Sequence, residues 1–275
     1  MKLIKKRLSL KAFTTILLAL AFLFSCTEKP LQNGNSNGSA TDNTDFVSYC
    51  AKEKTSKNQI YFNYPQFKET VVNAEELNDI IEASVVSFLQ GLLREDFMGS
   101  LKQMPEDWIW DNNNYTLWAM RVDYRIVRYD NDYVSVVFEG LCNNREDMRP
   151  IHFFSSITIN LEKCELVVLS DLYRIDMDFA EMVQKEFKEQ IRAGLAEKTG
   201  ASIDDIDERV EEAFPWVDSE SLLKILQQTK TSGSEHGFYF FLTDTSLGIS
   251  IPLNYVLGSH YEILIPYDEL VLFMK

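Results

Sequence analysis

The sequence lacks a hydrophobic run long enough to cross a membrane. Its most apolar segment, Ala12–Phe24, has only thirteen residues, two of them threonines, whereas a membrane-spanning helix needs about 20 apolar residues. The segment before it contains five lysine or arginine residues and no acidic residue, and the run ends at Ser25-Cys26. A basic stretch, a short apolar stretch and a small residue before a cleavage point are typical of a secretory signal peptide. We therefore expect residues 1–25 to direct export.

The end of this run is more specific than an ordinary signal peptide. Leu23-Phe24-Ser25-Cys26 resembles the bacterial lipobox, although Phe24 is bulkier than the residue usual at that position. The resemblance implies that the thiol of Cys26 is diacylated and that this cysteine becomes the mature N-terminus. The protein would then be anchored by lipid, palmitate included, to a bacterial membrane. In a diderm host, the anchored protein would be on the outer membrane, facing the periplasm or the surface. In a monoderm host, it would be at the cell surface. The alternative is a simple signal peptide with an incidental cysteine.

The segment after Cys26 has few apolar side chains. Residues 27–45 are rich in asparagine, glycine, serine, threonine and aspartate, and such a stretch cannot bury enough surface to offset its ordering entropy. We expect residues 26–54 to form a disordered tether. A coil of the length of residues 27–45 reaches about 25 Å.

Basic residues are scarce. The chain has 27 lysine and arginine residues against 42 aspartate and glutamate residues, a formal charge of −15. Removal of residues 1–25 takes five basic residues and no acid, which leaves 22 − 42 = −20. This charge disfavours nucleic acid and anionic lipid headgroups. Neutral glycans or cationic proteins are the expected partners, unless the acidity serves solubility alone.

Cysteine is also scarce, and so is any recognisable pattern of reactive residues. Cys50, Cys142 and Cys164 could form one disulfide with one thiol left over, or could be three small buried hydrophobic residues. Their spacing does not match a metal site. The sequence therefore leaves the disulfide question open.

Motifs of catalysis are missing. The sequence contains no nucleophile elbow, HExxH, CxxC, Walker A or GxGxxG pattern, and His152, His236 and His260 are too far apart to form a local metal site. We expect no catalytic residue, no metal and no cofactor. Accidental pairs among the many carboxylates leave an exported cell-wall hydrolase or deacetylase-type enzyme as an alternative.

Aromatic residues in a polar connection are the first lead to binding. Trp108 and Trp110 lie in an asparagine-rich segment, where their burial is not dictated by periodicity. Exposed rings there would stack on sugars or anchor a protein partner. Alternatively, the rings fold back over the sheet.

Hydrophobic periodicity predicts an α+β fold with antiparallel meander sheets and helices segregated from the strands. Residues 57–67 read as a strand, and Asn73 begins an amphipathic helix that runs to about Glu95. Asp130-Asn131-Asp132 has residue types that favour a tight turn, and it predicts the turn of a long hairpin. The further elements predicted are strands 152–160 and 165–173, a helix from Asp176 or Asp178 to Gly200, short helices in 202–214 and 218–229, and closing strands in 237–253 and 261–273 with a tight turn at Asp244–Gly248.

Three marks in this order resemble a known family. They are Asn131-Asp132-Tyr133-Val134-Ser135, Leu169-Ser170-Asp171-Leu172 and Ile265-Pro266-Tyr267-Asp268-Glu269-Leu270. They are similar to the paired exported modules found beside peptidoglycan deacetylase catalytic units and in lysozyme-sensing anti-sigma factors, the PdaC/RsiV-like architecture. The resemblance implies a PdaC-like module at 55–172 and an RsiV-like module at 173–275, which could pack as one unit.

The same resemblance implies a binding role without enzymatic activity. Neither deacetylase nor anti-sigma segments accompany the modules in this sequence, so we expect a non-enzymatic recognition module for cell-wall peptidoglycan or a cationic, lysozyme-like protein. Tyr255 and His260, which flank Gly258 in a predicted loop, are the candidate ligand contacts together with Trp108 and Trp110. Asn254 stands where the family usually has proline. A structural envelope protein without a soluble ligand is the second alternative.

Overall fold

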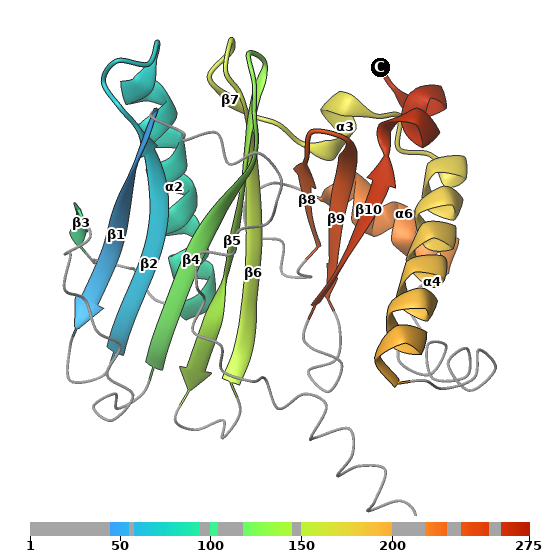
Figure 1. Cartoon of the computed structure of the whole chain (residues 1–275), viewed down its shortest axis with the longest axis horizontal. Helices are drawn as coiled ribbons and strands as arrows, with labels where there is room; N and C mark the ends of the chain where they lie inside the picture. Colours follow the sequence, from blue (N-terminus) through green and yellow to red (C-terminus); the bar gives the residue numbers. More distant parts are fainter. Residues whose placement is uncertain are drawn as a thin grey trace, which may run out of the picture. The chain divides into compact units, whose positions relative to one another are not determined.

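A computed structural model describes residues 45–54, 58–93, 100–103, 118–144, 150–199, 218–229, 238–252 and 260–275 (Figure 1). These residues belong to one compact unit, Asp45–Lys275. It is a mixed α+β unit with two sheets, as the sequence predicted. Within the described ranges, no helix is both long and apolar enough to cross a membrane.

The larger sheet has seven strands in the order β3-β1-β2-β4-β5-β6-β7. Its C-terminal part is the predicted antiparallel meander, in which β4 to β7 follow one another in sequence and in space. The strand predicted over 165–173 was wrong beyond its start, because only Glu165–Leu166 form β7 and Leu169–Leu172 form a helix. The strands are β1 (Phe46–Lys54), β2 (Asn58–Phe67), β3 (Ser100–Gln103), β4 (Trp118–Tyr129), β5 (Tyr133–Asn144), β6 (Pro150–Asn160) and β7 (Glu165–Leu166).

The tightest turn of the meander follows the predicted chemistry. Asp130 Oδ1 accepts hydrogen bonds from the backbone N–H groups of Asp132 and Tyr133, both at 2.8 Å. The carboxylate thus satisfies the donors that a reversing chain leaves free. On the incoming strand, the register shifts between Ile126 and Arg128, a bulge of the kind that re-aims a side chain.

Two predictions about the first strands were wrong. Residues 46–54, assigned to the tether, form β1, which pairs with β2 along its whole length. The alternation of apolar residues in "FVSYCAK" is a strand signal that the polar composition upstream concealed. The sheet is also not purely antiparallel, because β2 and β4 pair in parallel with α2 in the connection between them.

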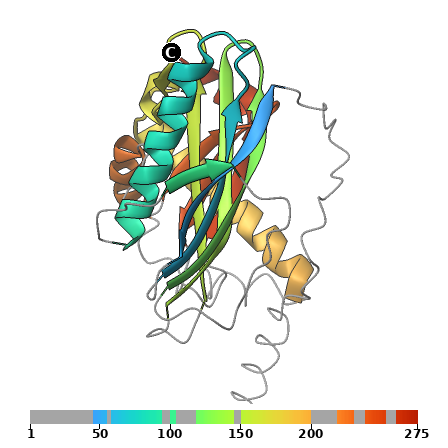
Figure 2. The same cartoon turned by 90° about the vertical axis from the view of Figure 1, so that its left-hand side faces the viewer.

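The first hydrophobic core lies between this sheet and α2 (Ala74–Leu93), the helix predicted after Asn73 (Figure 2). Phe62, Phe88 and Phe138 meet there, with the ring centroids of Phe62 and Phe138 5.3 Å apart. Val122 and Ile157 complete the layer from the meander. Every residue of this core comes from the stretch 51–164.

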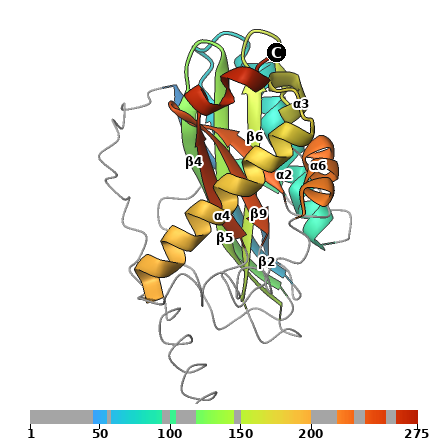
Figure 3. The same ribbon diagram turned by 90° about the vertical axis from the view of Figure 1, so that its right-hand side faces the viewer.

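The second core lies between the three-stranded sheet β10-β9-β8 and the helices that pack on one of its faces (Figure 3). It draws on residues 167–273. The elements are α3 (Leu169–Leu172), α4 (Met177–Thr199), α6 (Ser219–Gln228), β8 (Tyr239–Leu242), β9 (Ser246–Pro252), β10 (His260–Pro266) and the 3₁₀-helix η2 (Tyr267–Phe273). The predicted helix in 202–214 lies outside the described residues, and so does Gly200, the predicted end of α4.

Aspartate caps begin two of these helices. Asp176 Oδ1 accepts a hydrogen bond from the N–H of Phe179 at 3.1 Å, at the start of α4. Asp218 Oδ1 accepts from Ser221 N at 2.9 Å, at the start of α6. Each cap satisfies a first-turn N–H group that has no partner within the helix.

The β8–β9 turn is shorter than predicted. Gly248 lies inside β9 and not in a turn, and the chain reverses at residues 243–245, where Thr243 Oγ1 accepts from Ser246 N at 2.9 Å. Gly248 is opposite Phe241, and a Cβ at this position would lie 2.2 Å from the Phe241 ring. Glycine is therefore required by a close approach.

Side-chain amides complete the backbone pairing at two strand edges. Gln190 on α4 donates to Leu264 O at 2.8 Å and accepts from Leu264 N at 3.0 Å. Asn78 on α2 does the same at Phe67, with distances of 3.0 and 2.7 Å. The apolar residues on both faces of 261–266 predict a strand that is covered on both sides, and this prediction was wrong at Leu264, which is 46% exposed.

Candidate functional site

The two sheets meet along a seam of small hydroxyl side chains. Ser156 Oγ donates to Phe240 O at 2.7 Å, and Ser135 Oγ accepts from Leu242 N at 3.0 Å. Both bonds pair backbone groups of β8 with the face of the meander. A small apolar cluster of Val137, Phe154, Tyr239 and Phe241 fills the same junction. The smaller sheet is thereby held to the larger one.

A charged cluster lies at one part of this junction. Arg125 on β4 places Nη2 2.9 Å from Glu139 Oε1 on β5 and 3.3 Å from Glu262 Oε2 on β10. His260 Nε2, also on β10, is 3.8 Å from Glu262 Oε1. His260 and Glu262 share a face of β10 because side chains alternate along a strand. The cluster therefore joins both sheets through charged groups.

The surroundings of the cluster restrict its side chains. The ring of Phe154 lies 4.6 Å from that of His260, and His260 Nδ1 is buried with no hydrogen-bond partner among the described residues. His260 and Glu262 are 20% and 27% exposed. The imidazole is held by packing, with only Nε2 facing the carboxylates.

Ionisation follows from these contacts. Burial alone would raise the pKa of Glu262, but the nearby His260 and the charge of Arg125 outweigh it and lower this pKa. Burial would lower the pKa of Arg125, whereas its bond to Glu139 raises it. Burial and, second, the charge of His260 lower the pKa of His152 on β6. Glu262 is thus a carboxylate at neutral pH.

Glu262 is not suited to be the general acid of a glycoside hydrolase. A glycosidase keeps one carboxyl group protonated by raising its pKa. Glu262 has a lowered pKa and shares Arg125 with Glu139. The pair is suited to binding positive charge.

Of the ligand contacts predicted from the sequence, the structure describes His260. It lies at the start of β10 and joins the charged cluster. Tyr255, Trp108, Trp110 and the lipid-attachment residue Cys26 lie outside the described residues. Sequence reasoning missed Arg125, Glu139 and Glu262, because nothing local links β4 and β5 to a strand more than a hundred residues later.

A second feature is the acidic end, which we define by the turns and helix ends at the top of Figure 1. These are the β2–α2, β4–β5, β6–β7 and β8–β9 turns, α3, the start of α4 and η2. They carry twelve exposed acidic residues: Glu69, Glu75, Glu76, Asp130, Asp132, Glu162, Glu165, Asp171, Asp178, Asp244, Asp268 and Glu269.

Basic residues at this end are fewer and partly neutralised. They are Lys68, Arg128, Lys163, Arg174 and Lys275. Arg128 pairs with Asp130 and Arg174 pairs with Asp176, each at 2.5 Å. The acidic end therefore carries an excess of negative charge.

Direct contacts make the acidic end continuous across both sheets. Leu161 N donates to Asp132 O at 2.9 Å, which joins two turns of the meander. Arg128 Nη1 donates to Tyr267 Oη at 3.1 Å and lies over the Tyr267 ring, 5.9 Å from its centroid. Tyr267 N donates to Thr245 O at 3.1 Å. The acidic turns thus belong to one surface.

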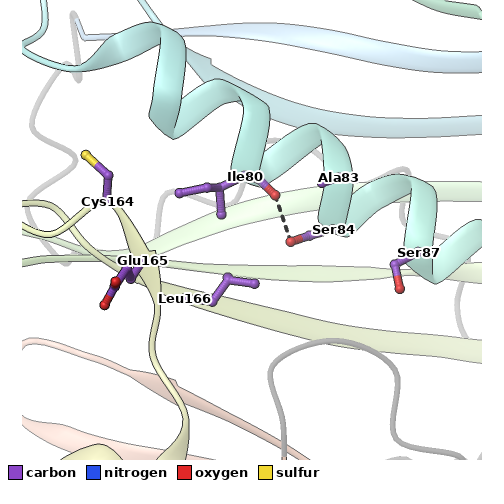
Figure 4. Close-up of a pocket in the computed structure, with 7 residues that line it drawn as sticks. All are labelled: Ile80, Ala83, Ser84, Ser87, Cys164, Glu165 and Leu166. Atoms are coloured by element: carbon purple, nitrogen blue, oxygen red, sulfur yellow. Dashed lines mark hydrogen bonds between the residues drawn. The ribbon is translucent and has the colours of Figure 1, made fainter.

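A groove of about 530 Å³ lies between α2 and the β6–β7 turn (Figure 4). It is lined by Ile80, Ala83, Ser84, Ser87, Cys164, Glu165 and Leu166. Ser84 Oγ donates to Ile80 O at 2.8 Å, so this hydroxyl is engaged within the helix. The lining has no aromatic ring on which a sugar could stack.

The structure describes the three cysteines for which the sequence left two alternatives, a disulfide or three small buried residues. Among the described residues, Cys50, Cys142 and Cys164 form no disulfide, and all three are buried. Burial raises the pKa of Cys142 to about 12, which keeps its thiol protonated and unreactive. Of the two sequence alternatives, the structure has the three small buried residues.

The fold is similar to that of two solved structures. One is a DUF3298 family protein from Pseudomonas aeruginosa PAO1, with a TM-score of 0.47, 12% identity, and coverage of 84% of this chain and 92% of that chain. The other is a member of the same family from Bacteroides fragilis NCTC 9343, with a TM-score of 0.47, 10% identity, and coverage of 84% and 91%. The similarity concerns the fold alone. No protein-family model matches the sequence, and no curated protein is similar to it.

Proposed function

We propose that the protein is a lipid-anchored, non-enzymatic recognition module of the bacterial envelope that binds a cationic, lysozyme-like protein through the acidic end. The proposal rests on the excess of carboxylates over basic side chains on this continuous surface. Complementary charge steers a cationic partner to such a surface and rejects anionic ones. Peptidoglycan glycan is the other candidate ligand, and the groove beside α2 does not favour it because its lining lacks aromatic rings.

Charge reversal at the acidic end is expected to weaken binding of lysozyme. Asp268 and Glu269 are exposed on η2. The double variant Asp268→Lys/Glu269→Lys should raise Kd about tenfold, equivalent to about 1.4 kcal/mol. Binding of purified lysozyme to the immobilised protein, measured by interferometry at low and high salt, checks this. Binding to the native protein should also weaken as salt rises, because salt screens exposed charges.

A matched control separates local from global charge. Glu189→Lys/Glu220→Lys changes the net charge by the same amount at exposed positions on α4 and α6 outside the acidic end. This variant should bind lysozyme as the native protein does. Equal weakening by both variants, or retention on purified peptidoglycan with no binding to lysozyme, contradicts the proposal.

Anchoring is tested separately from recognition. Cys26→Ala should release the protein from membranes, because each buried CH₂ of an acyl chain contributes about 0.8 kcal/mol to membrane binding. Fractionation and metabolic palmitate labelling measure this, with Ser36→Ala in the tether as the control that stays membrane-bound. Membrane association of Cys26→Ala, together with no label on the native protein, rules out the lipid anchor.

A further inference from the structure

Glu139, His260 and Glu262 offer three metal-ligand atoms that all lie within 4.8 Å of one another. One residue comes from β5 of the larger sheet and two come from β10 of the smaller sheet. Strands position the ligands, and the packing of Phe154 on His260 fixes the imidazole. The arrangement is therefore set by the framework of the fold.

The spacing within the cluster suits a shared ion better than a direct hydrogen bond. His260 Nε2 lies 3.8 Å from Glu262 Oε1, whereas a direct N–H···O bond spans about 2.7–3.2 Å. Two ligands of one tetrahedral ion with bonds of about 2.0–2.1 Å lie about 3.4 Å apart. A cation between these two atoms therefore needs a shift of only a few tenths of an ångström.

His260 has no competing partner to divert it. Its Nδ1 is buried without a hydrogen-bond partner among the described residues. Its Nε2 faces the carboxylates at a distance too long for a hydrogen bond. Among the described residues, neither ring nitrogen of His260 makes a hydrogen bond, so Nε2 is open to a metal ion.

Arg125 is compatible with a cation at this place. Its Nη2 lies 2.9 Å from Glu139 Oε1 and 3.3 Å from Glu262 Oε2, so it holds one oxygen of each carboxylate, and Glu262 Oε1 remains on the side of His260. Such an outer partner orients a ligating carboxylate. Two carboxylates and one guanidinium carry a net charge of −1, which attracts a cation.

We propose that Glu139, His260 and Glu262 bind one divalent transition-metal ion of the zinc type, which joins β5 to β10. One imidazole nitrogen and two carboxylate oxygens are a ligand set for Zn²⁺ and Co²⁺, and the nitrogen ligand disfavours Ca²⁺ and Mg²⁺. The inference does not rest on the proposed function, because the cluster lies at the junction of the sheets and not in the acidic end.

Titration of the full-length protein in detergent with Zn²⁺, followed by calorimetry, tests the site. We expect one ion per chain, an increase in Tm with added Zn²⁺, and visible absorption bands when Co²⁺ replaces Zn²⁺. His260→Gln, Glu262→Gln and Glu139→Gln should each weaken binding by about 100-fold or more. His152→Gln, on the neighbouring strand β6, and Glu189→Gln, on α4, should bind as the native protein does.

The three variants His260→Gln, Glu262→Gln and Glu139→Gln are also compared with the native protein in the absence of metal, to check that they fold. Each should show the native circular dichroism spectrum without metal, so that lost binding is not lost structure. The proposal is overturned by absence of binding to the native protein at 1 mM Zn²⁺ (a weak limit on the order of 4 kcal/mol). It is equally overturned by a stoichiometry that the three substitutions leave unchanged, or by a loss that follows His152→Gln.

Discussion

Replacing Phe62 with alanine is expected to lower the free energy of unfolding by about 3–5 kcal/mol. Phe62 is fully buried in the first core, and its ring centroid lies 5.3 Å from that of Phe138 and 5.6 Å from that of Phe153. Truncation removes these contacts and leaves a cavity that α2 and the sheet cannot close. Urea denaturation followed by circular dichroism measures the change.

Val72→Ala is the control for this substitution. Val72 lies before α2 with 81% of its surface exposed, so the free energy of unfolding should change by about 0.5 kcal/mol or less. A loss below about 1 kcal/mol for Phe62→Ala, or an equal loss for both variants, contradicts the packing described for the first core.

Ile265→Ala is expected to cost about 2–5 kcal/mol. Ile265 is fully buried in the second core, which Leu247 and Leu270 also line. The adjacent Leu264 points to the other face of β10 and is 46% exposed. Leu264→Ala therefore controls for side-chain size and position on the same strand, and it should cost much less. A larger loss in the free energy of unfolding for Leu264→Ala than for Ile265→Ala would mean that the two faces of β10 are exchanged.

The two core substitutions together test whether the two cores unfold as one. The serine seam and the charged cluster join the sheets, so we expect a single cooperative transition that both substitutions move. Two transitions, each shifted by one substitution, would mean that the modules at 55–172 and 173–275 are separate folding units.

Periodicity predicted the elements whose signal is local. The heptad-like spacing from Leu77 to Leu89 predicted α2, and the Asp130-Asn131-Asp132 turn predicted the β4–β5 hairpin, because both depend on neighbours in sequence. The apolar residues on both faces of 261–266 likewise predict that Ile265 is structural, and it is fully buried. In each case, the physical cause lies within a few residues.

Long-range pairing could not be predicted in this way. The partner of β1 and the parallel register of β2 with β4 depend on which strands meet, and alternation within one strand does not encode this. The charged cluster shows the same limit. His260 was selected for its place beside a predicted loop, but its neighbours Glu139 and Arg125 come from strands whose docking against β10 is decided by the seam.

The amides of Gln190 and Asn78 occupy backbone groups that a strand of another molecule could otherwise use. A strand edge with free N–H and C=O groups is a template on which another chain can add a strand. At Leu264, both backbone groups on the outer edge of β10 are already occupied by Gln190, and Asn78 occupies those of Phe67 where β2 has lost β4 as its neighbour. A strand added at either residue would have to displace an amide held by a helix.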